Sequence, residues 1–199
     1  MFRNQKSKIN LRDLPPASVL AEELKVLQYK ERYLRALKST VSTLITVAAI
    51  AVLITTIWLP VLQIYGNSMS PTLEAGDMVV SISARKLKTG DTIAFYYNNK
   101  VLVKRVIATS GQWVELKKDG TVYIDGKKLN EPYLKEKVLG DTNIKLPYQV
   151  PDGKIFVMGD HRSTSVDSRN TAVGPVSEEQ YVGKLTFRIW PVSKIGWVK

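Results

Sequence analysis

The pattern of hydrophobic and polar positions divides the chain into three parts. Residues 1–38 are rich in charged side chains, residues 39–62 form a long apolar run, and residues 63–199 alternate short apolar runs with turn sequences. No Asp, Glu, Lys or Arg occurs between Lys38 and Glu74. A helix needs about 20 apolar residues to cross a bilayer. The pattern therefore predicts a single transmembrane anchor over residues 39–62.

The part before the anchor predicts a helix with leucines along one face. Pro15-Pro16 can open a helix, and helical spacing then runs from Ala17 to Lys38. The leucines on that face are Leu20, Leu24, Leu27, Leu34 and Leu37. Two interpretations stay open. The segment is an amphipathic helix that lies on the membrane or pairs with a partner, or it extends the anchor helix with a solvated charged face.

Charge predicts how the chain is oriented in the membrane. The formal net charge is +11, and residues 1–38 hold nine Lys or Arg against four Asp or Glu. Because basic flanks stay on the cytoplasmic side, we expect residues 1–38 to form a cytoplasmic tail and residues 63–199 to lie outside the cytoplasm, anchored in the plasma membrane. After residue 38 the basic side chains are scattered, so the lipid bilayer is the expected partner and nucleic acid is not. The apolar run starts too far along the chain and is too long for a cleaved signal peptide.

The part after the anchor predicts a mainly-β domain of short strands. Runs of β-branched and aromatic residues are separated by turn sequences, and Asp119-Gly120 joins two of them closely enough for a hairpin. The expected strands are 78–83, 92–97, 101–109, 113–116, 122–125, 155–158 and 184–190. Residues from about 120 to 150 are less regular and are expected to leave the core. The domain is expected to be barrel-like or sandwich-like.

The composition excludes several kinds of catalytic and metal-binding site. The chain has no cysteine, so thiolate nucleophiles, disulfides and thiolate metal sites are excluded. It has one histidine, His161, which is too few for a histidine-rich metal site. No metal or cofactor is therefore expected.

The remaining candidates for catalysis are a serine and a lysine. Ser68 follows the anchor closely, and a serine hydroxyl needs a nearby base to act as a nucleophile. Lys104 and Arg105 lie in the apolar run 101–108 on opposite faces, and alternation alone does not say which points inward. Burial can lower the pKa of a lysine, whereas arginine stays protonated in proteins, so Lys104 is the favoured base. His161 remains an alternative base, and a turn-forming Ser68 with a strand-edge Lys104 is the non-catalytic alternative.

A polar loop follows the apolar run 154–158. Residues 159–169 read GDHRSTSVDSR, and such a loop after a core strand is a common place for site residues. Asp167 and Arg169 can form an ion pair that fixes the loop, and the Ser165 hydroxyl can orient a neutral lysine. A solvated loop with Asx turns is the alternative.

Several ordered segments together resemble the type I signal peptidase family, membrane-anchored Ser/Lys proteases of bacteria. The apolar anchor is followed by SMSPTL at 68–73, GDMVV at 76–80, TGDTIAF at 89–95, VKRVI at 103–107, the 159–169 loop and RIWP at 188–191. The resemblance covers roughly residues 53–197. It implies a catalytic β-domain of short antiparallel strands after one transmembrane helix. It also implies acyl-enzyme cleavage of secreted preproteins after small residues, which removes their signal peptides.

The resemblance also implies roles for individual residues. Ser68 would be the nucleophile and Lys104 the general base. Ser165 would orient Lys104, and Asp167 and Arg169 would brace the site. The chain departs from the family pattern at two positions: Gly66 stands where some members have a second oxyanion donor, and His161 stands where the pattern has Asn. A membrane-tethered β-domain that binds envelope proteins or lipid, without catalysis, is the competing function.

Overall fold

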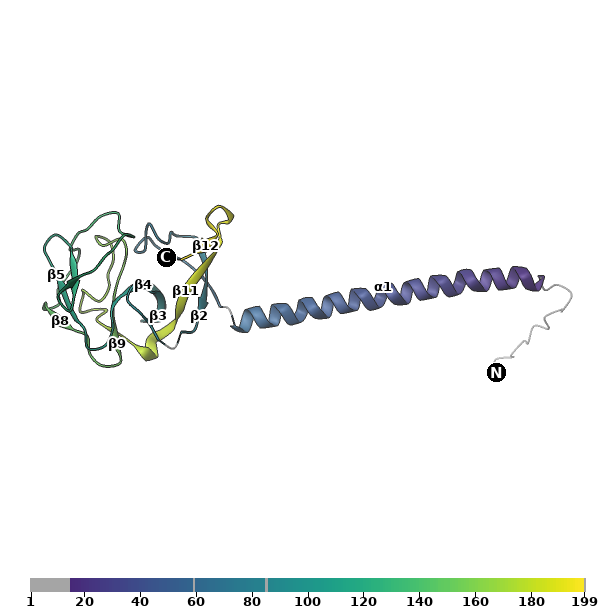
Figure 1. Cartoon of the computed structure of the whole chain (residues 1–199), viewed down its shortest axis with the longest axis horizontal. Helices are drawn as coiled ribbons and strands as arrows, with labels where there is room; N and C mark the ends of the chain where they lie inside the picture. Colours follow the sequence, from purple (N-terminus) through teal and green to yellow (C-terminus); the bar gives the residue numbers. More distant parts are fainter. Residues whose placement is uncertain (1–14, 59, 85, 199) are drawn as a thin grey trace, which may run out of the picture. The chain divides into compact units, whose positions relative to one another are not determined.

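The computed structural model describes residues 15–58, 60–84 and 86–198. The chain divides into a helical unit that ends at Ile54 and a β unit that begins at Thr55. The helical unit is formed by one helix, α1 (Ala17–Trp58), whose last four residues fall in the β unit. Figure 1 shows α1 as a continuous coil. Its portion Ala17–Leu53 is long and apolar enough to cross a membrane. The expected single N-terminal apolar helix is therefore present.

Proline residues account for both ends of α1. The helix starts directly after Pro15-Pro16, and residue 60, two positions after its end at Trp58, is also proline. Because a proline disfavours helical geometry in the residue before it, the helix does not continue to residue 62. The predicted end of the anchor is therefore wrong, since Val61 and Leu62 belong to a strand.

Hydroxyl groups inside the apolar part of α1 are satisfied by the helix itself. Thr40, Thr43 and Thr46 each donate a hydrogen bond of 2.9–3.0 Å to the carbonyl four residues earlier. A polar group with no partner is costly in hydrocarbon. These bonds therefore let three threonines lie in a segment that suits a bilayer.

The β unit contains twelve short strands in the described residues. They are β1 (Val61–Gln63), β2 (Met78–Ile82), β3 (Thr92–Tyr97), β4 (Lys100–Ala108), β5 (Trp113–Leu116), β6 (Val122–Ile124), β7 (Lys127–Lys128), β8 (Tyr148–Gln149), β9 (Lys154–Met158), β10 (Val176–Ser177), β11 (Tyr181–Trp190) and β12 (Gly196–Trp197). Two 3₁₀ turns, Glu178–Gln180 and Val192–Lys194, flank β11. The seven strands expected from the sequence are all present with ends shifted by a few residues, whereas five strands of two or three residues were not foreseen.

The strands form two antiparallel sheets. The larger has the order β1-β2-β11-β3-β4-β9-β10, with β12 paired to β11. The smaller has the order β7-β6-β5-β8. Figure 1 shows β5 and β8 at one end of the β unit and β2, β11 and β12 at the other. The expected mainly-β fold of short antiparallel strands after one N-terminal helix is confirmed.

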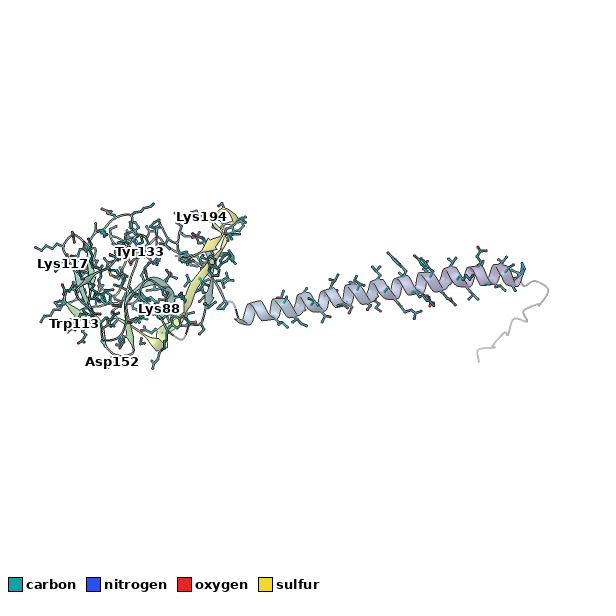
Figure 2. The ribbon with its side chains drawn as sticks, in the orientation of Figure 1. Lys88, Trp113, Lys117, Tyr133, Asp152 and Lys194 are labelled. Atoms are coloured by element: carbon teal, nitrogen blue, oxygen red, sulfur yellow. The ribbon has the colours of Figure 1, made fainter. Side chains whose placement is uncertain are left out.

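The smaller sheet includes the two ends of the segment that was expected to leave the core, and residues 129–147 between β7 and β8 form no strand. Its hairpin of β5 and β6 turns at Asp119-Gly120, as the sequence predicted. The segment starts earlier than expected, because β5 at Trp113 already belongs to it. Figure 2 shows Trp113 and Lys117 at the outer edge of the β unit. Val114 and Val122 from this sheet pack in one cluster with residues of β4 and β9, so the two sheets share a core.

A second buried cluster lies under the segment that carries Ser68. It contains Met69 and Leu73 from that segment, together with Val79, Ala94 and Leu185 from three strands of the larger sheet. Burying a side chain of this size stabilises a fold by about 1.5–3 kcal/mol. The residues that follow Ser68 are thus anchored in the core.

Candidate active site

Ser68 lies on a turn-rich segment that is tied to the larger sheet at both ends. The Ile64 N–H donates to the Asp77 carbonyl at 2.8 Å. Met69 and Leu73 are fully buried, whereas Ser68 itself is half-buried. The segment therefore holds its backbone in the core and presents the Ser68 hydroxyl to a partly open surface.

Lys104 reaches Ser68 from strand β4. Its Nζ lies 2.7 Å from Ser68 Oγ, within hydrogen-bond distance, and its side chain is 3% exposed. Burial lowers the pKa of Lys104 to about 8; Asp167 opposes this shift, whereas Arg169 adds to it. At pH 7 a lysine with that pKa is neutral in about one molecule in ten, against roughly 0.04% at the ordinary pKa.

Arg105 points to the other face of β4 and is fully paired. Its guanidinium makes two hydrogen bonds of 2.7–2.8 Å to Asp160 and one of 2.8 Å to the Gly90 carbonyl. The guanidinium also stacks 4.0 Å from the ring centroid of Tyr133. Only 2% of Arg105 is exposed, so the alternative in which both basic head groups reach water is wrong.

The 159–169 loop is braced by a buried ion pair. Arg169 makes two side-chain hydrogen bonds of 2.8 Å to Asp167, and neither side chain is exposed. Asp167 also accepts from the Gly159 N–H at 2.9 Å and from the Ser165 hydroxyl at 2.7 Å. In the described residues the Ser165 hydroxyl makes its bond to Asp167 and none to Lys104, so its orienting role stays a prediction.

Gly159 allows the loop to approach the Ser68 segment closely. A Cβ at this position would lie 2.5 Å from the Ser68 carbonyl oxygen and 2.5 Å from Ser165 Cβ. Real Cβ contacts are never this short, so any side chain here must displace the backbone that carries Ser68. The requirement for glycine comes from this contact, because Gly159 has no left-handed φ.

We expect Gly159→Ala to lower any catalytic activity of Ser68 by about 10²-fold, because a displacement of about 1 Å at a reacting group has an effect of that size. Overpacking should also lower the free energy of unfolding by about 1–3 kcal/mol. Gly196→Ala is the matched control, since a Cβ there meets no atom within 4 Å. Equal rates of covalent labelling of Ser68 by an acylating probe in the two variants would contradict the close approach.

His161 contacts the Ser68 segment through its backbone. Its N–H donates to the Ser68 carbonyl at 3.0 Å. Its imidazole makes no hydrogen bond to the Ser68 hydroxyl within the described residues, and Nδ1 is buried with no partner there. The geometry thus favours Lys104 over His161 as the neighbour of Ser68 Oγ.

Gly66 lies on the open side of the segment with φ of +83°. A Cβ at Gly66 would meet no atom within 4 Å. A serine there would fit the space, but it would have to adopt a left-handed backbone, which L residues adopt at a cost of about 1 kcal/mol. The local backbone therefore accounts for glycine at this position.

A groove of about 730 Å³ leads to Ser68 and Lys104. One wall is β1 with residues 64–69, and the other is the first half of β4, residues 100–104. Among the described residues, β1 pairs only with β2, and β4 pairs with β9 only from Arg105 onward. Both walls therefore offer backbone groups that are not used by the sheet, and an extended peptide can pair with such an edge.

Sequence reasoning singled out Ser68, Lys104 and Gly66 but not the other residues that line this groove. Val61 and Leu62 were assigned to the anchor, although Pro60 was a signal that the helix ends before them. The partners of two of the three buried arginines were also missed. Arg105 pairs with Asp160, and Arg162 pairs with Glu131 from the segment after β7. Those pairs join residues distant in sequence, so no local pattern indicates them.

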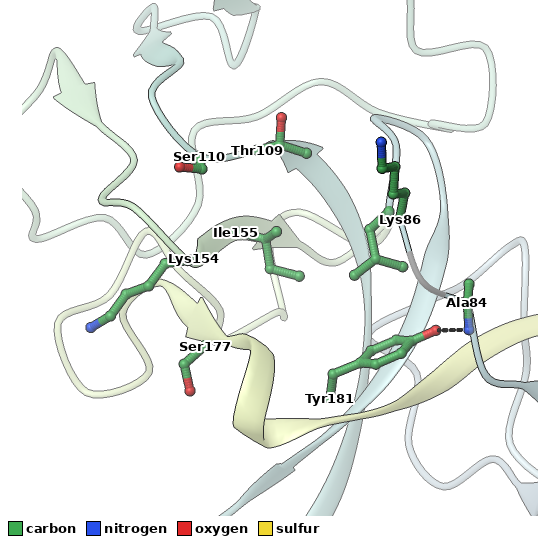
Figure 3. Close-up of a pocket in the computed structure, with 10 residues that line it drawn as sticks. Ala84, Lys86, Thr109, Ser110, Lys154, Ile155, Ser177 and Tyr181 are labelled. Carbon is green, nitrogen blue, oxygen red and sulfur yellow. Dashed lines mark hydrogen bonds between the residues drawn. The ribbon is translucent and has the colours of Figure 1, made fainter.

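A different cavity, of about 400 Å³, has neither Ser68 nor Lys104 in its lining. It is formed by β9, β10, β11 and the segments that follow β2 and β4 (Figure 3). Two residues of its lining are hydrogen-bonded to each other, since the Ala84 N–H donates to Tyr181 Oη at 3.2 Å. It is therefore separate from the catalytic candidates.

Comparison with known proteins places the chain among peptidases. A family described as "Signal peptidase, peptidase S26" matches residues 37–190. Signal peptidase IB of Staphylococcus aureus is 42% identical over 151 residues, which cover 66% of this chain and 78% of that protein. Thylakoidal processing peptidase 1 of Arabidopsis thaliana is 35% identical over 150 residues, covering 67% of this chain and 42% of that protein. A crystal structure of a signal peptidase I from Enterococcus faecalis V583 is 33% identical, with a TM-score of 0.45, over 52% of this chain and 100% of that one.

The chain is thus a serine endopeptidase. More specifically, it belongs to the signal peptidase family, peptidase S26, and is a type I signal peptidase that removes signal peptides from preproteins. The resemblance seen in the ordered motifs is confirmed, and the alternative of a non-catalytic binding domain is not supported.

Proposed function

We propose that this enzyme cleaves preproteins with a Ser/Lys dyad in which Ser68 is the nucleophile and Lys104 the general base. The observation that carries the proposal is the 2.7 Å contact between Ser68 Oγ and a buried lysine whose pKa burial lowers to about 8. A serine nucleophile needs a base within hydrogen-bond reach, and neutral Lys104 meets this condition.

The reaction then proceeds by acyl transfer. Neutral Lys104 takes the Ser68 proton as Oγ attacks the scissile carbonyl, and a tetrahedral oxyanion forms. The protonated lysine gives its proton to the leaving amine, the C–N bond breaks, and the mature protein departs. Lys104 next takes a proton from water as the water attacks the ester. It then returns this proton to Ser68 Oγ as the ester C–O bond breaks, which releases the signal peptide and restores neutral Lys104.

The surrounding residues would support this chemistry indirectly. The Ser68 N–H is the proposed oxyanion donor, because preorganised donors stabilise the developing charge, and Gly66 offers no hydroxyl. Asp167 and Arg169 would fix the loop next to Lys104, and their opposite effects on the pKa of Lys104 would partly cancel. Ser165 would act through Asp167, to which its hydroxyl donates.

The groove supports an extended signal-peptide end as the substrate. A strand between β1 and β4 would pair with both walls and bring its last carbonyl to Ser68. Ile64 and Met69 are buried apolar neighbours along this path. We propose that cleavage follows small residues, as in the A-x-A pattern of signal peptides.

We propose that the enzyme is a single-pass plasma-membrane protein. Residues 1–38 would be cytoplasmic, α1 from residue 39 to Trp58 would cross the bilayer, and the β unit would lie outside the cytoplasm. The basic flank before the apolar run supports this orientation. Exposed apolar side chains in one part of the larger sheet would also suit a bilayer surface: Met78, Trp190, Val192, Ile195 and Trp197.

The direct test is cleavage of a precursor by the detergent-solubilised full chain. We expect a new N-terminus directly after a small residue, identified by sequencing the product. A precursor with bulky residues at the first and third positions before the cut should remain intact. Cleavage of both precursors alike would contradict the proposed specificity.

The rate should depend on pH through Lys104. Only its neutral form accepts a proton, so kcat/KM is expected to rise about tenfold per pH unit below pH 8 and to level off above its pKa of about 8. Cleavage measured from pH 6 to 10 checks this. If the rise of kcat/KM had its midpoint between pH 6 and pH 7, and this rise disappeared in His161→Gln, the base would be His161 instead.

A further inference from the structure

A small hollow adjoins the segment that carries Ser68 and shares no lining residue with the groove. Its volume is about 190 Å³, and its lining includes Ser70, two residues after the nucleophile candidate, and His161, whose N–H binds the Ser68 carbonyl. Neither Ser68 nor Lys104 lines it. The hollow therefore adjoins the site without being part of the groove.

Two residues that line this hollow each carry a buried nitrogen that has no partner within the described residues. Arg162 Nη1 and His161 Nδ1 are both buried in this way. The Arg162 side chain is completely buried, and Glu131 pairs with its other terminal nitrogen, Nη2. A buried polar group without a partner costs free energy. Both residues line the hollow, so a ligand bound there lies next to these two nitrogens.

The proposed reaction indicates which part of the substrate would lie at the hollow. If the signal-peptide end fills the groove and its last carbonyl lies at Ser68, the chain beyond the scissile bond must leave on the opposite side. We propose that the first residues of the mature protein bind in this hollow. This inference rests on the proposed Ser/Lys function, and it concerns the leaving side of the substrate.

Two charged side chains at the hollow would select the substrate by charge. Lys135 and Glu136 line it and are exposed, so they stand at its rim. The other two charged groups of the lining are engaged: Asp160 by Arg105, and Arg162 by Glu131. A charged side chain among the first mature residues would then interact with Lys135 and Glu136. Each interaction would change kcat/KM by about three- to fivefold, as is usual for exposed charge pairs.

The test uses the full-length enzyme and two precursors that share a signal peptide and differ only at the second mature residue, Asp or Lys. We expect Lys135→Glu to shift the kcat/KM ratio toward the Lys precursor, and Glu136→Lys to shift it toward the Asp precursor. Each reversal should change the ratio by about tenfold, because it replaces attraction by repulsion. Lys137→Glu is the control, since Lys137 is exposed but does not line the hollow.

Opposite shifts in the two variants, with less than a twofold shift in the control, would support the inference. Ratios that equal the wild-type ratio in both variants while cleavage continues would overturn it. The same holds if the control shifts the ratio as much as Lys135→Glu. Failure of the wild-type enzyme to cleave either precursor would instead contradict the proposed function, so the two failures are distinguishable.

Discussion

Ser68→Ala is expected to lose cleavage by a factor of about 10⁴ or more while the protein stays folded. Removing the nucleophile of a serine protease leaves only the rate enhancement due to binding and oxyanion stabilisation. Here the hydroxyl is half-buried and its one described side-chain partner is Lys104. The fold should tolerate the change, because the segment is anchored by Met69 and Leu73 rather than by Ser68.

The control for this variant is Ser83→Ala, which removes an exposed hydroxyl distant from the groove lining. We expect its kcat/KM to match the wild type, measured with the same precursor. Circular dichroism and thermal unfolding should give the same fold for all three proteins. Cleavage by Ser68→Ala within about tenfold of the wild type would remove Ser68 from the mechanism.

Lys104→Met is expected to abolish cleavage and to make the protein more stable at pH 7. A folded-state pKa of about 8 lies well below the ordinary value of 10.5, so burial of the charged form opposes folding. Each pKa unit corresponds to about 1.4 kcal/mol. Removing the charge should therefore raise the free energy of unfolding by about 1–3 kcal/mol, after the lost hydrogen bond to Ser68 is taken into account.

The destabilisation by the buried charge of Lys104 should decrease as the pH rises. Below pH 8 the lysine is protonated in both states, and the folded state carries the whole penalty. Between pH 8 and about 10.5 the folded protein releases its proton first, so wild-type stability should rise with pH and approach that of the variant. Lys100→Met, an exposed change on the same strand, should show no such convergence. Urea unfolding at pH 7 and pH 10 measures all three proteins, and a variant less stable than the wild type at pH 7 would contradict the buried charge.

The sequence predicted the parts of the fold that depend on local pattern. The apolar run predicted α1, and alternating runs with turn residues predicted β3, β4, β5 and β9 closely. Five strands of two or three residues were missed, because so short a segment shows no alternation of apolar and polar residues. β1 was assigned to the anchor because its residues are as apolar as the helix before it, and only Pro60 marks the change.

The sequence predicted the contacts of Lys104 with Ser68 and of Asp167 with Arg169, but not the partners of Arg105 and Ser165. The inward position of Lys104 rests on its burial against the core, whereas Arg105 is held by Asp160 and Tyr133, which come from other segments. Ser165 was expected at Lys104, yet its hydroxyl donates to Asp167. The contacts of Arg105 arise where segments far apart in the sequence meet, so the sequence pattern alone does not contain them. Ser165 and Asp167 are only two residues apart, and their bond depends on how the loop folds.

The central claim is that Ser68 forms the acyl-enzyme with the help of Lys104. The most direct measurement treats the enzyme with an acylating peptide ester that ends in a small residue, and then locates the adduct by peptide mass mapping. We expect one adduct on Ser68, absent in Ser68→Ala and much slower to form in Lys104→Met. An adduct on another residue, or equal labelling of the Lys104→Met variant, would contradict the account.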